Sequence, residues 1–140
     1  MESKLFVDSD VIIDFLIDRE PHTTISNELF ELADTGEIML FTSSLSINNI
    51  HYIARKIIGE SKTREVIGEL MAFIDILSVE KQHLQYALLS EFKDFEDAIQ
   101  HEVALSNKEV KAIITRNTKD YRKSKIAVLE PRAILELLKR

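Results

Sequence analysis

Short runs of consecutive apolar residues alternate along the chain with longer segments in which apolar positions recur at helical spacing. Consecutive apolar residues are typical of strands buried on both faces, as in a parallel sheet that helices cover on either side. The strands are expected at Lys4–Asp8, Ile38–Phe41, Ile74–Val79, Val110–Ile114 and Ile126–Leu129. The alternation of strands and helices therefore predicts an α/β fold with a central parallel sheet of about five strands.

Turn and capping residues separate the predicted helices from the strands. One helix, VIIDFLID, begins three residues after Asp8, and a second is predicted to be entered through Pro21 and closed at Gly36. Further helices are expected up to Gly59, at 66–74, from the acidic segment DFED onward, and after Pro131. With 140 residues, 45% of them hydrophobic, and no internal repeat or linker, we expect a single domain over residues 1–140.

Composition excludes several classes of site. The chain has no Cys, which excludes a disulfide scaffold and a zinc–thiolate site. Its first ten residues, MESKLFVDSD, resemble neither a signal peptide nor a membrane anchor, so we expect a cytoplasmic protein with no membrane contact. A net charge of −6 argues against broad electrostatic adhesion to nucleic acid, but it is compatible with an enzyme that binds phosphates through a local basic patch.

Acidic and amide side chains follow the predicted strands, and sites in open parallel sheets form beyond the carboxyl ends of the strands. Asp8 ends the first strand and Asp10 follows it, while TRNTKDY follows the strand Val110–Ile114. Asp14 lies four residues beyond Asp10 and is expected on the polar face of that helix. Taken singly, each has an ordinary structural explanation, because Asp caps helices and Asn, Thr and Asp form turns. Taken together, carboxylates that converge at one edge require protons or a cation, and Mg²⁺ or Mn²⁺ is the cation that prefers oxygen ligands.

The ordered blocks LFVDSDVIID, TSSLSINNIHYIARK, DFEDAIQ, AIITRNTKDY and IAVLEP resemble the PIN family over essentially the whole chain. The branch with DFEDA and TRN-x-x-D-[FY] blocks is the most similar one. The resemblance implies a three-layer α/β/α sandwich and a metal-dependent ribonuclease. Many members of the family are toxins of the virulence-associated protein C type, so it also implies an RNA substrate, a possible antitoxin partner and a possible homodimer.

The resemblance also assigns roles to individual residues. Asp8 matches the first metal-binding Asp, Asp97 the acid at the start of the late helix, and Asp94 an additional Asp of this branch. Asn117 stands where many members have another Asp, and Asp120 follows three residues later as a substitute. The expected catalytic residues are Asp8, Asp97, Asp94 and Asp120, and the expected ligands of Mg²⁺ or Mn²⁺ are Asp8, Asp97, Asp94 and Asn117.

Asn49 is the largest departure from the family pattern, because it stands where the family usually carries Glu. An amide oxygen can ligate a metal but brings no charge and no base. Asp10 stands where the family often has Asn, and whether it compensates is open. Asp10, Asn49 and Arg116, the last as a substrate contact, are the weaker site candidates.

Two alternatives to a ribonuclease remain open at this point. The first is a non-catalytic PIN-fold module that binds RNA or a protein partner, which the amides at Asn49 and Asn117 favour. The second is a phosphatase of the haloacid dehalogenase type, because the segment from Asp8 to Val11 fits that family's D-x-D-x-[TV] block. The second alternative predicts a covalent aspartyl phosphate at Asp8.

Overall fold

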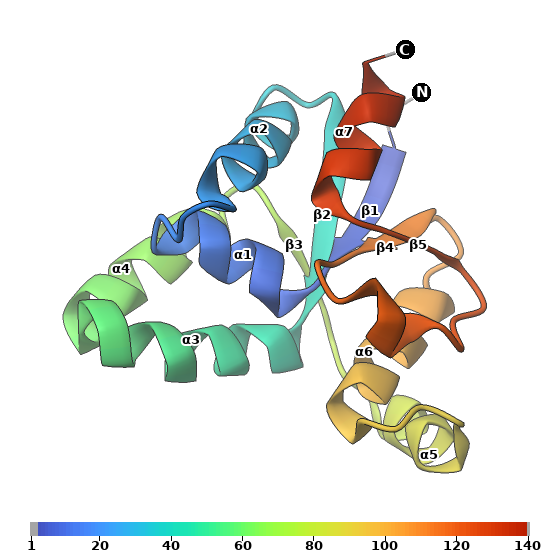
Figure 1. The fold of residues 1–140 in the computed structure, drawn as a ribbon. Coiled ribbons are helices and arrows are strands. Elements are labelled where there is room, and N and C mark those ends of the chain that lie inside the picture. Colours follow the sequence, from blue (N-terminus) through green and yellow to red (C-terminus); the bar gives the residue numbers. More distant parts are fainter. Residues whose placement is uncertain (1–2, 140) are drawn as a thin grey trace.

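The computed structural model describes residues 3–139, whose strands all pair in one sheet in the order β3-β2-β1-β4-β5 (Figure 1). The strands are β1 (Ser3–Val7), β2 (Ile38–Ser43), β3 (Asp75–Leu77), β4 (Ala112–Ile114) and β5 (Ala127–Leu129). Every neighbouring pair is parallel, so the predicted parallel α/β sheet is confirmed. β3 is shorter than predicted and lies at the edge of the sheet, where it pairs only with β2.

Helices cover both faces of the sheet. They are α1 (Ser9–Leu16), α2 (Thr23–Asp34), α3 (Ser44–Ile58), α4 (Glu60–Leu70), α5 (Lys81–Leu89), α6 (Phe95–Ser106) and α7 (Pro131–Leu138), with a 3₁₀ helix, η1 (Thr118–Tyr121). Helices α1 to α4 and α7 pack on one face, and α5, α6 and η1 pack on the other (Figure 1). This arrangement is the three-layer α/β/α sandwich that was expected.

Burial on both faces explains the continuous apolar runs. In β1, Leu5 and Val7 enter the core beneath α1 and α2, whereas Phe6 between them enters the core beneath α6. In β4, Ala112 and Ile114 lie on the first side and Ile113 on the second. Successive side chains of a strand point to opposite faces, so a strand covered on both sides needs an apolar residue at every position.

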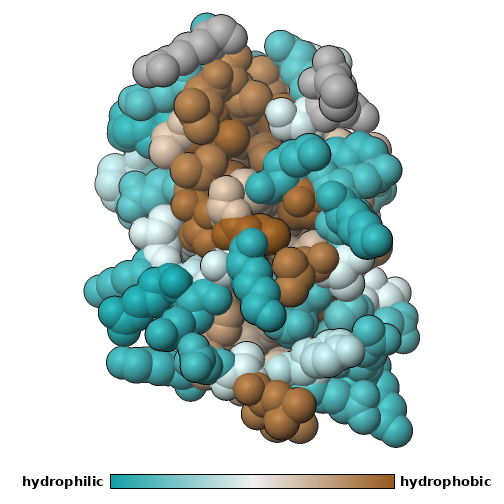
Figure 2. All heavy atoms as spheres, turned by 90° about the vertical axis from the view of Figure 1, so that its right-hand side faces the viewer, coloured by the Kyte–Doolittle hydropathy of each residue, from teal (hydrophilic) through white to brown (hydrophobic). Residues whose placement is uncertain are grey.

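Three helices differ from the prediction. The helix expected at 66–74 is α4, which spans Glu60–Leu70, because residues 71–74 form the turn that leads into β3. The second helix begins at Thr23, two residues after Pro21, because residues 20–22 form a turn. Helix α5 was not predicted at all. Only Ala87 of α5 is buried, while Leu88 and Leu89 are 71% and 84% exposed, so most apolar side chains of this helix do not enter the core. Figure 2 shows an isolated apolar cluster at the foot of the molecule, the level at which α5 lies in Figure 1.

In the part of the chain that the structure describes, we find no helix with the length and apolarity needed to cross a membrane.

Candidate functional site

Asp8 lies at the carboxyl end of β1 and caps α1. Its Oδ1 accepts a hydrogen bond from the backbone N–H of Ser9 (2.8 Å), and its Oδ2 accepts one from the Thr115 hydroxyl (2.9 Å). Burial raises the pKa of Asp8 more than these hydrogen bonds lower it, and the charge of Glu96 raises it further. The helix cap suggested by the sequence is therefore present, but it holds a largely buried carboxylate whose ionisation is opposed by its surroundings.

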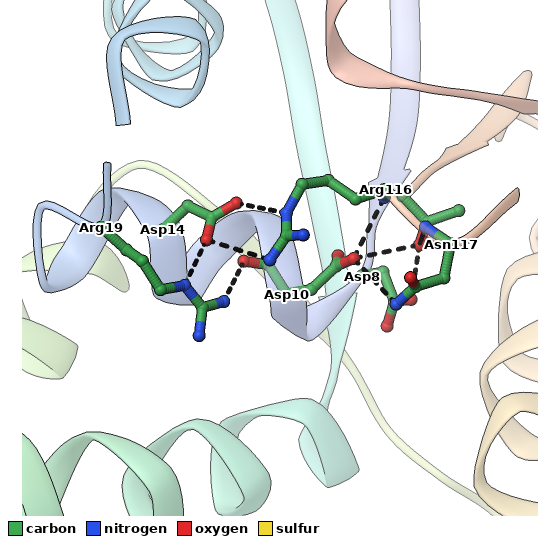
Figure 3. A network of polar contacts seen from close by, with 7 residues as sticks. Asp8, Asp10, Asp14, Arg19, Arg116 and Asn117 are labelled. Carbon is green, nitrogen blue, oxygen red and sulfur yellow. Dashed lines mark hydrogen bonds and ion pairs between the residues drawn. The ribbon is translucent and has the colours of Figure 1, made fainter. Parts of the chain in front are cut away.

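Asp10 lies in the first turn of α1 and faces the segment that follows β4 (Figure 3). Its Oδ2 accepts hydrogen bonds from the backbone N–H of Arg116 (3.0 Å) and from the Asn117 amide (3.3 Å). Its Oδ1 is buried and has no hydrogen-bond partner among the described residues. Burial, and then the charge of Asp8, raises the pKa of Asp10 to about 6. Oδ1 of Asp10 thus has no hydrogen-bond donor within residues 3–139, in surroundings that disfavour the ionised carboxylate.

Asp97 belongs to the amino-terminal turn of α6, on the other side of Asp8. Its backbone N–H is capped by the side chain of Asp94 (2.9 Å). Burial raises the pKa of Asp97 to about 7, and the charges of Asp8, Asp94, Asp120 and, least, Glu96 add to the effect. Asp97 is therefore the residue on which the charges of β1, α6 and η1 act together.

A second network lies farther along α1 (Figure 3). Asp14 is only 1% exposed and binds two guanidinium groups, through Nε of Arg19 (2.6 Å) and through Nε of Arg116 (2.7 Å). The sequence placed Asp14 on the polar face of its helix, which is wrong, because the segment after β4 covers it. The Arg116 side chain is therefore used to bind α1 to that segment, while its backbone N–H binds Asp10.

Asn49, on α3, lies opposite the amino-terminal turn of α6. Its Nδ2 donates a hydrogen bond to Oε1 of Glu96. Burial, followed by the charge of Asp94, raises the pKa of Glu96. Glu96 was not among the residues selected from the sequence, because only the contact with α3 distinguishes it from an ordinary first-turn acid.

Tyr121, at the end of η1, is a second residue that the sequence did not single out. Its side chain is 1% exposed, and its hydroxyl has no hydrogen-bond partner of normal geometry among the described residues. Burial, the charges of Asp8, Asp97 and Asp10, and an interaction of the hydroxyl with the Asp8 carboxylate raise the pKa of Tyr121, so the hydroxyl lies next to Asp8.

A cavity of 390 Å³ opens beside Asp97. Both acidic and basic residues line it, including Asp94, Asp97, Asp120, Lys93, Lys119, Arg122 and Lys123. Lys119, Arg122 and Lys123, on η1 and just after it, thus lie next to the carboxylates, together with Lys93 from the loop before α6. Such a border of cations is suited to phosphate oxygens.

Comparison with known proteins identifies the fold and its relatives. Residues 4–119 match the family model described as PIN domain. The chain belongs to the PIN domain family. It is 30% identical over 131 residues to Ribonuclease VapC1 of Aquifex aeolicus, and the match covers 90% of this chain and 89% of that protein.

Solved structures share this PIN fold at lower identity. VapBC2 of Rickettsia felis, bound to a DNA fragment from its promoter, matches with a TM-score of 0.68 and 14% identity. A toxin–antitoxin complex from Klebsiella pneumoniae matches with a TM-score of 0.68 and 21% identity. Each match covers 91% of this chain and 97% of the other chain. At these identities the similarity establishes the fold alone.

The donor groups of this PIN domain fit a hard divalent cation in their chemistry. Asp8, Asp10 and Asp97 supply carboxylate oxygens whose ionised forms are disfavoured in the metal-free site. Among residues 3–139, however, no group of three Asp, Glu or His side chains converges into a complete metal cage. Mg²⁺ is compatible with such a site, because it keeps several waters and uses only one or two protein carboxylates.

Proposed function

We propose that this chain is a metal-dependent endoribonuclease that hydrolyses phosphodiester bonds of RNA, and that it acts as the toxin of a toxin–antitoxin pair. The observation that carries the proposal is the group of carboxylates around Asp8 and Asp97, which lies at the carboxyl end of the sheet beside a cavity bordered by cations. Membership of the PIN family and the similarity to Ribonuclease VapC1 support hydrolysis of RNA over the phosphatase alternative.

Asp8 and Asp97 are the principal ligands in this proposal, and the cation is Mg²⁺ or Mn²⁺. Asp94, Asn117 and Asp10 border the same site and complete its oxygen donors. When bound, the cation activates water and stabilises charge on the phosphate. Asp120 lies where it adds negative charge near Asp97 and can accept a proton at the edge of the cavity.

The basic border of the cavity positions the substrate. Lys119, Arg122 and Lys123 follow β4 on η1 and the turn after it, and Lys93 precedes α6. Each can donate to phosphate oxygens on either side of the scissile bond without reading the bases. Arg116 supports this surface indirectly in our proposal, since its ion pair with Asp14 fixes the start of the segment that carries the other cations.

Exposed apolar residues on α3 provide a surface for a protein partner. Tyr52 is 53%, Ile53 39% and Ile57 59% exposed, and Met71 after α4 is 51% exposed. An antitoxin segment or a second copy of the chain would bury them, and both solved relatives described above are toxin–antitoxin assemblies. We therefore propose an antitoxin as the partner of this surface.

The function is tested by incubating the protein with RNA in Mg²⁺, in Mn²⁺ and in EDTA. The variants Asp8→Asn and Asp97→Asn are compared with the wild type and with Asp75→Asn, which changes an exposed Asp of β3. A bound metal supplies several kcal/mol of transition-state stabilisation and each 1.36 kcal/mol is tenfold, so we expect both site variants to lose about 100-fold or more in rate. Cleavage that persists in both variants would refute the mechanism.

One alternative is supported by a specific observation. Amides at Asn49 and Asn117 replace two carboxylates of the family pattern, which favours a PIN-fold module that binds RNA without cutting it. A wild-type protein that binds RNA but neither binds Mn²⁺ nor cleaves would establish this alternative in place of the nuclease.

A further inference from the structure

We propose that the groove between α2 and α7 is a docking surface for a basic, amphipathic segment of a partner protein. The groove has a volume of 640 Å³ and lies where α2 ends, β2 begins and α7 ends (Figure 1). It is separate from the carboxylates around Asp8 and from the exposed apolar residues of α3. The inference therefore goes beyond the proposed function and does not depend on it.

The groove lies at the edge of the sheet opposite to Asp8. Ile38, the first residue of β2, lines the groove and pairs with Ser3, the first residue of β1. Asp8 follows the last residue of β1, so the five residues of this strand, about 16 Å at about 3.3 Å per residue, separate the groove from Asp8. A segment anchored in the groove leaves the cavity beside Asp97 accessible.

The floor of the groove is apolar. Leu32 of α2, Ile38 of β2, and Leu135 and Leu138 of α7 line it. Ile38 and Leu135 are buried, whereas Leu32 and Leu138 are half-buried and keep part of their surface open to solvent. The volume falls in the range of about 300–1,000 Å³ that is typical of ligand pockets. Apolar side chains of a partner would cover the open surface of the two leucines, which favours binding.

The rim of the groove is acidic and is formed by Glu28, Glu31 and Glu37. The basic residue that lines the groove, Lys139, lies 3.6 Å from Glu28. Glu37 accepts a hydrogen bond from the Thr35 hydroxyl (2.9 Å), and within residues 3–139 neither Glu31 nor Glu37 forms an ion pair. Two negative charges at the rim are thus available to the cations of a partner.

The ends of two helices add to the negative potential of the rim. The carboxyl-terminal ends of α2 and α7 both lie at the groove, and neither helix has a basic residue in its last turn. The carboxyl-terminal end of a helix carries a partial negative charge, which attracts cations and disfavours nucleic acid and anionic membranes. Lys and Arg suit this surface, because their apolar stems lie along apolar side chains while their charged ends reach carboxylates. The complementary partner is therefore a segment with apolar anchors flanked by Lys or Arg.

Binding of a synthetic peptide to the full chain tests the proposal. The probe is a fluorescein-labelled amphipathic peptide of Leu and Lys, about 14 residues long, and its control has Glu in place of every Lys. By fluorescence anisotropy we expect the Glu peptide to bind at least about tenfold more weakly than the Lys peptide. Glu31→Gln and Glu37→Gln should each weaken binding of the Lys peptide about threefold, and the double charge reversal Glu31→Lys with Glu37→Lys at least about 30-fold. Glu69→Gln makes the same change on exposed α4, two residues before the exposed Met71, and should leave binding unchanged.

Backbone amide shifts in NMR spectra map where the Lys peptide binds. We expect the shifts to concentrate at Leu32, Thr35 and Leu138, and circular dichroism to show that the variants keep the wild-type fold, because both substituted glutamates are exposed. The proposal is overturned if the charge reversal binds the Lys peptide as tightly as the wild type, or if the shifted amides belong to α3. It is also overturned if the wild type does not bind the Lys peptide at up to about 1 mM. If the wild type sediments as an oligomer that the charge reversal dissociates, a second copy of the chain is the occupant and the proposed partner is wrong.

Discussion

Replacing Asp97 by Asn should stabilise the metal-free protein near neutral pH, although we expect the same change to abolish cleavage. Burial is the main cause that raises the pKa of Asp97 from 3.8 to about 7, and the charges of Asp8, Asp94, Asp120 and Glu96 add to it. At pH 7.5 the folded protein must therefore ionise a carboxyl that its surroundings disfavour. Asn keeps the size and polarity of the side chain and removes that cost.

The size of the effect follows from the difference between the two pKa values. A rise from 3.8 to about 7 corresponds to at most about 4 kcal/mol at 1.36 kcal/mol per pH unit. Asp97 is only half-buried, so solvent screening reduces this to about 1–2 kcal/mol. Loss of an acid from the first turn of α6 costs about 0.5 kcal/mol. We expect a net gain of about 1 kcal/mol, which corresponds to about 3 °C in Tm for a chain of this length.

Thermal unfolding in EDTA at pH 7.5 and at pH 4 measures the effect and its sign. A raised acid pKa means that the folded state binds more protons than the unfolded state between about pH 4 and pH 7, so stability falls as the pH rises through this window. The advantage of Asp97→Asn should thus be present at pH 7.5 and absent at pH 4. Asp75→Asn, in an exposed position, should change Tm little at either pH. If Asp97→Asn has a lower Tm than the wild type at pH 7.5, the contacts of Asp97 stabilise the folded protein more than its buried charge destabilises it.

Two further predictions concern the metal and the second network. Mn²⁺ should raise Tm more at pH 7.5 than at pH 5.5. The reason is that protons compete with the cation for Asp10 and Asp97 below their pKa values of about 6 and 7. Equal shifts in Tm at both pH values would contradict a site made of these acids. Asp14→Asn should lower the free energy of unfolding in urea by about 2 kcal/mol, since Arg19 and Arg116 lose a buried partner and both remain partly solvated. The control Glu109→Gln breaks an exposed ion pair and should leave the urea midpoint unchanged. If both variants lower the midpoint equally, Asp14 contributes no more to the free energy of unfolding than a surface charge does.

Strand positions were predictable because their cause is local in the sequence. β1 and β4 are buried on both faces, which requires an unbroken apolar run and leaves a clear signal. The position of Asp8 at the carboxyl end of β1 was predictable for the same reason, because Asp8 is the first polar residue after the apolar run of that strand. Helix α5 shows the converse. Ala87 is the residue of α5 that is buried against the rest of the fold. The pattern of apolar residues in α5 therefore gave no clear prediction of a helix.

The contacts between segments were not predictable, because they depend on how helices rotate when they pack. Asp14 was assigned to solvent from the periodicity of α1, but the segment after β4 covers that side and brings Arg116 to it. Glu96 was passed over in favour of Asp94 and Asp97, since any first-turn acid complements a helix dipole equally well in sequence. Only the buried contacts of Gln100 determine which of these acids faces α3.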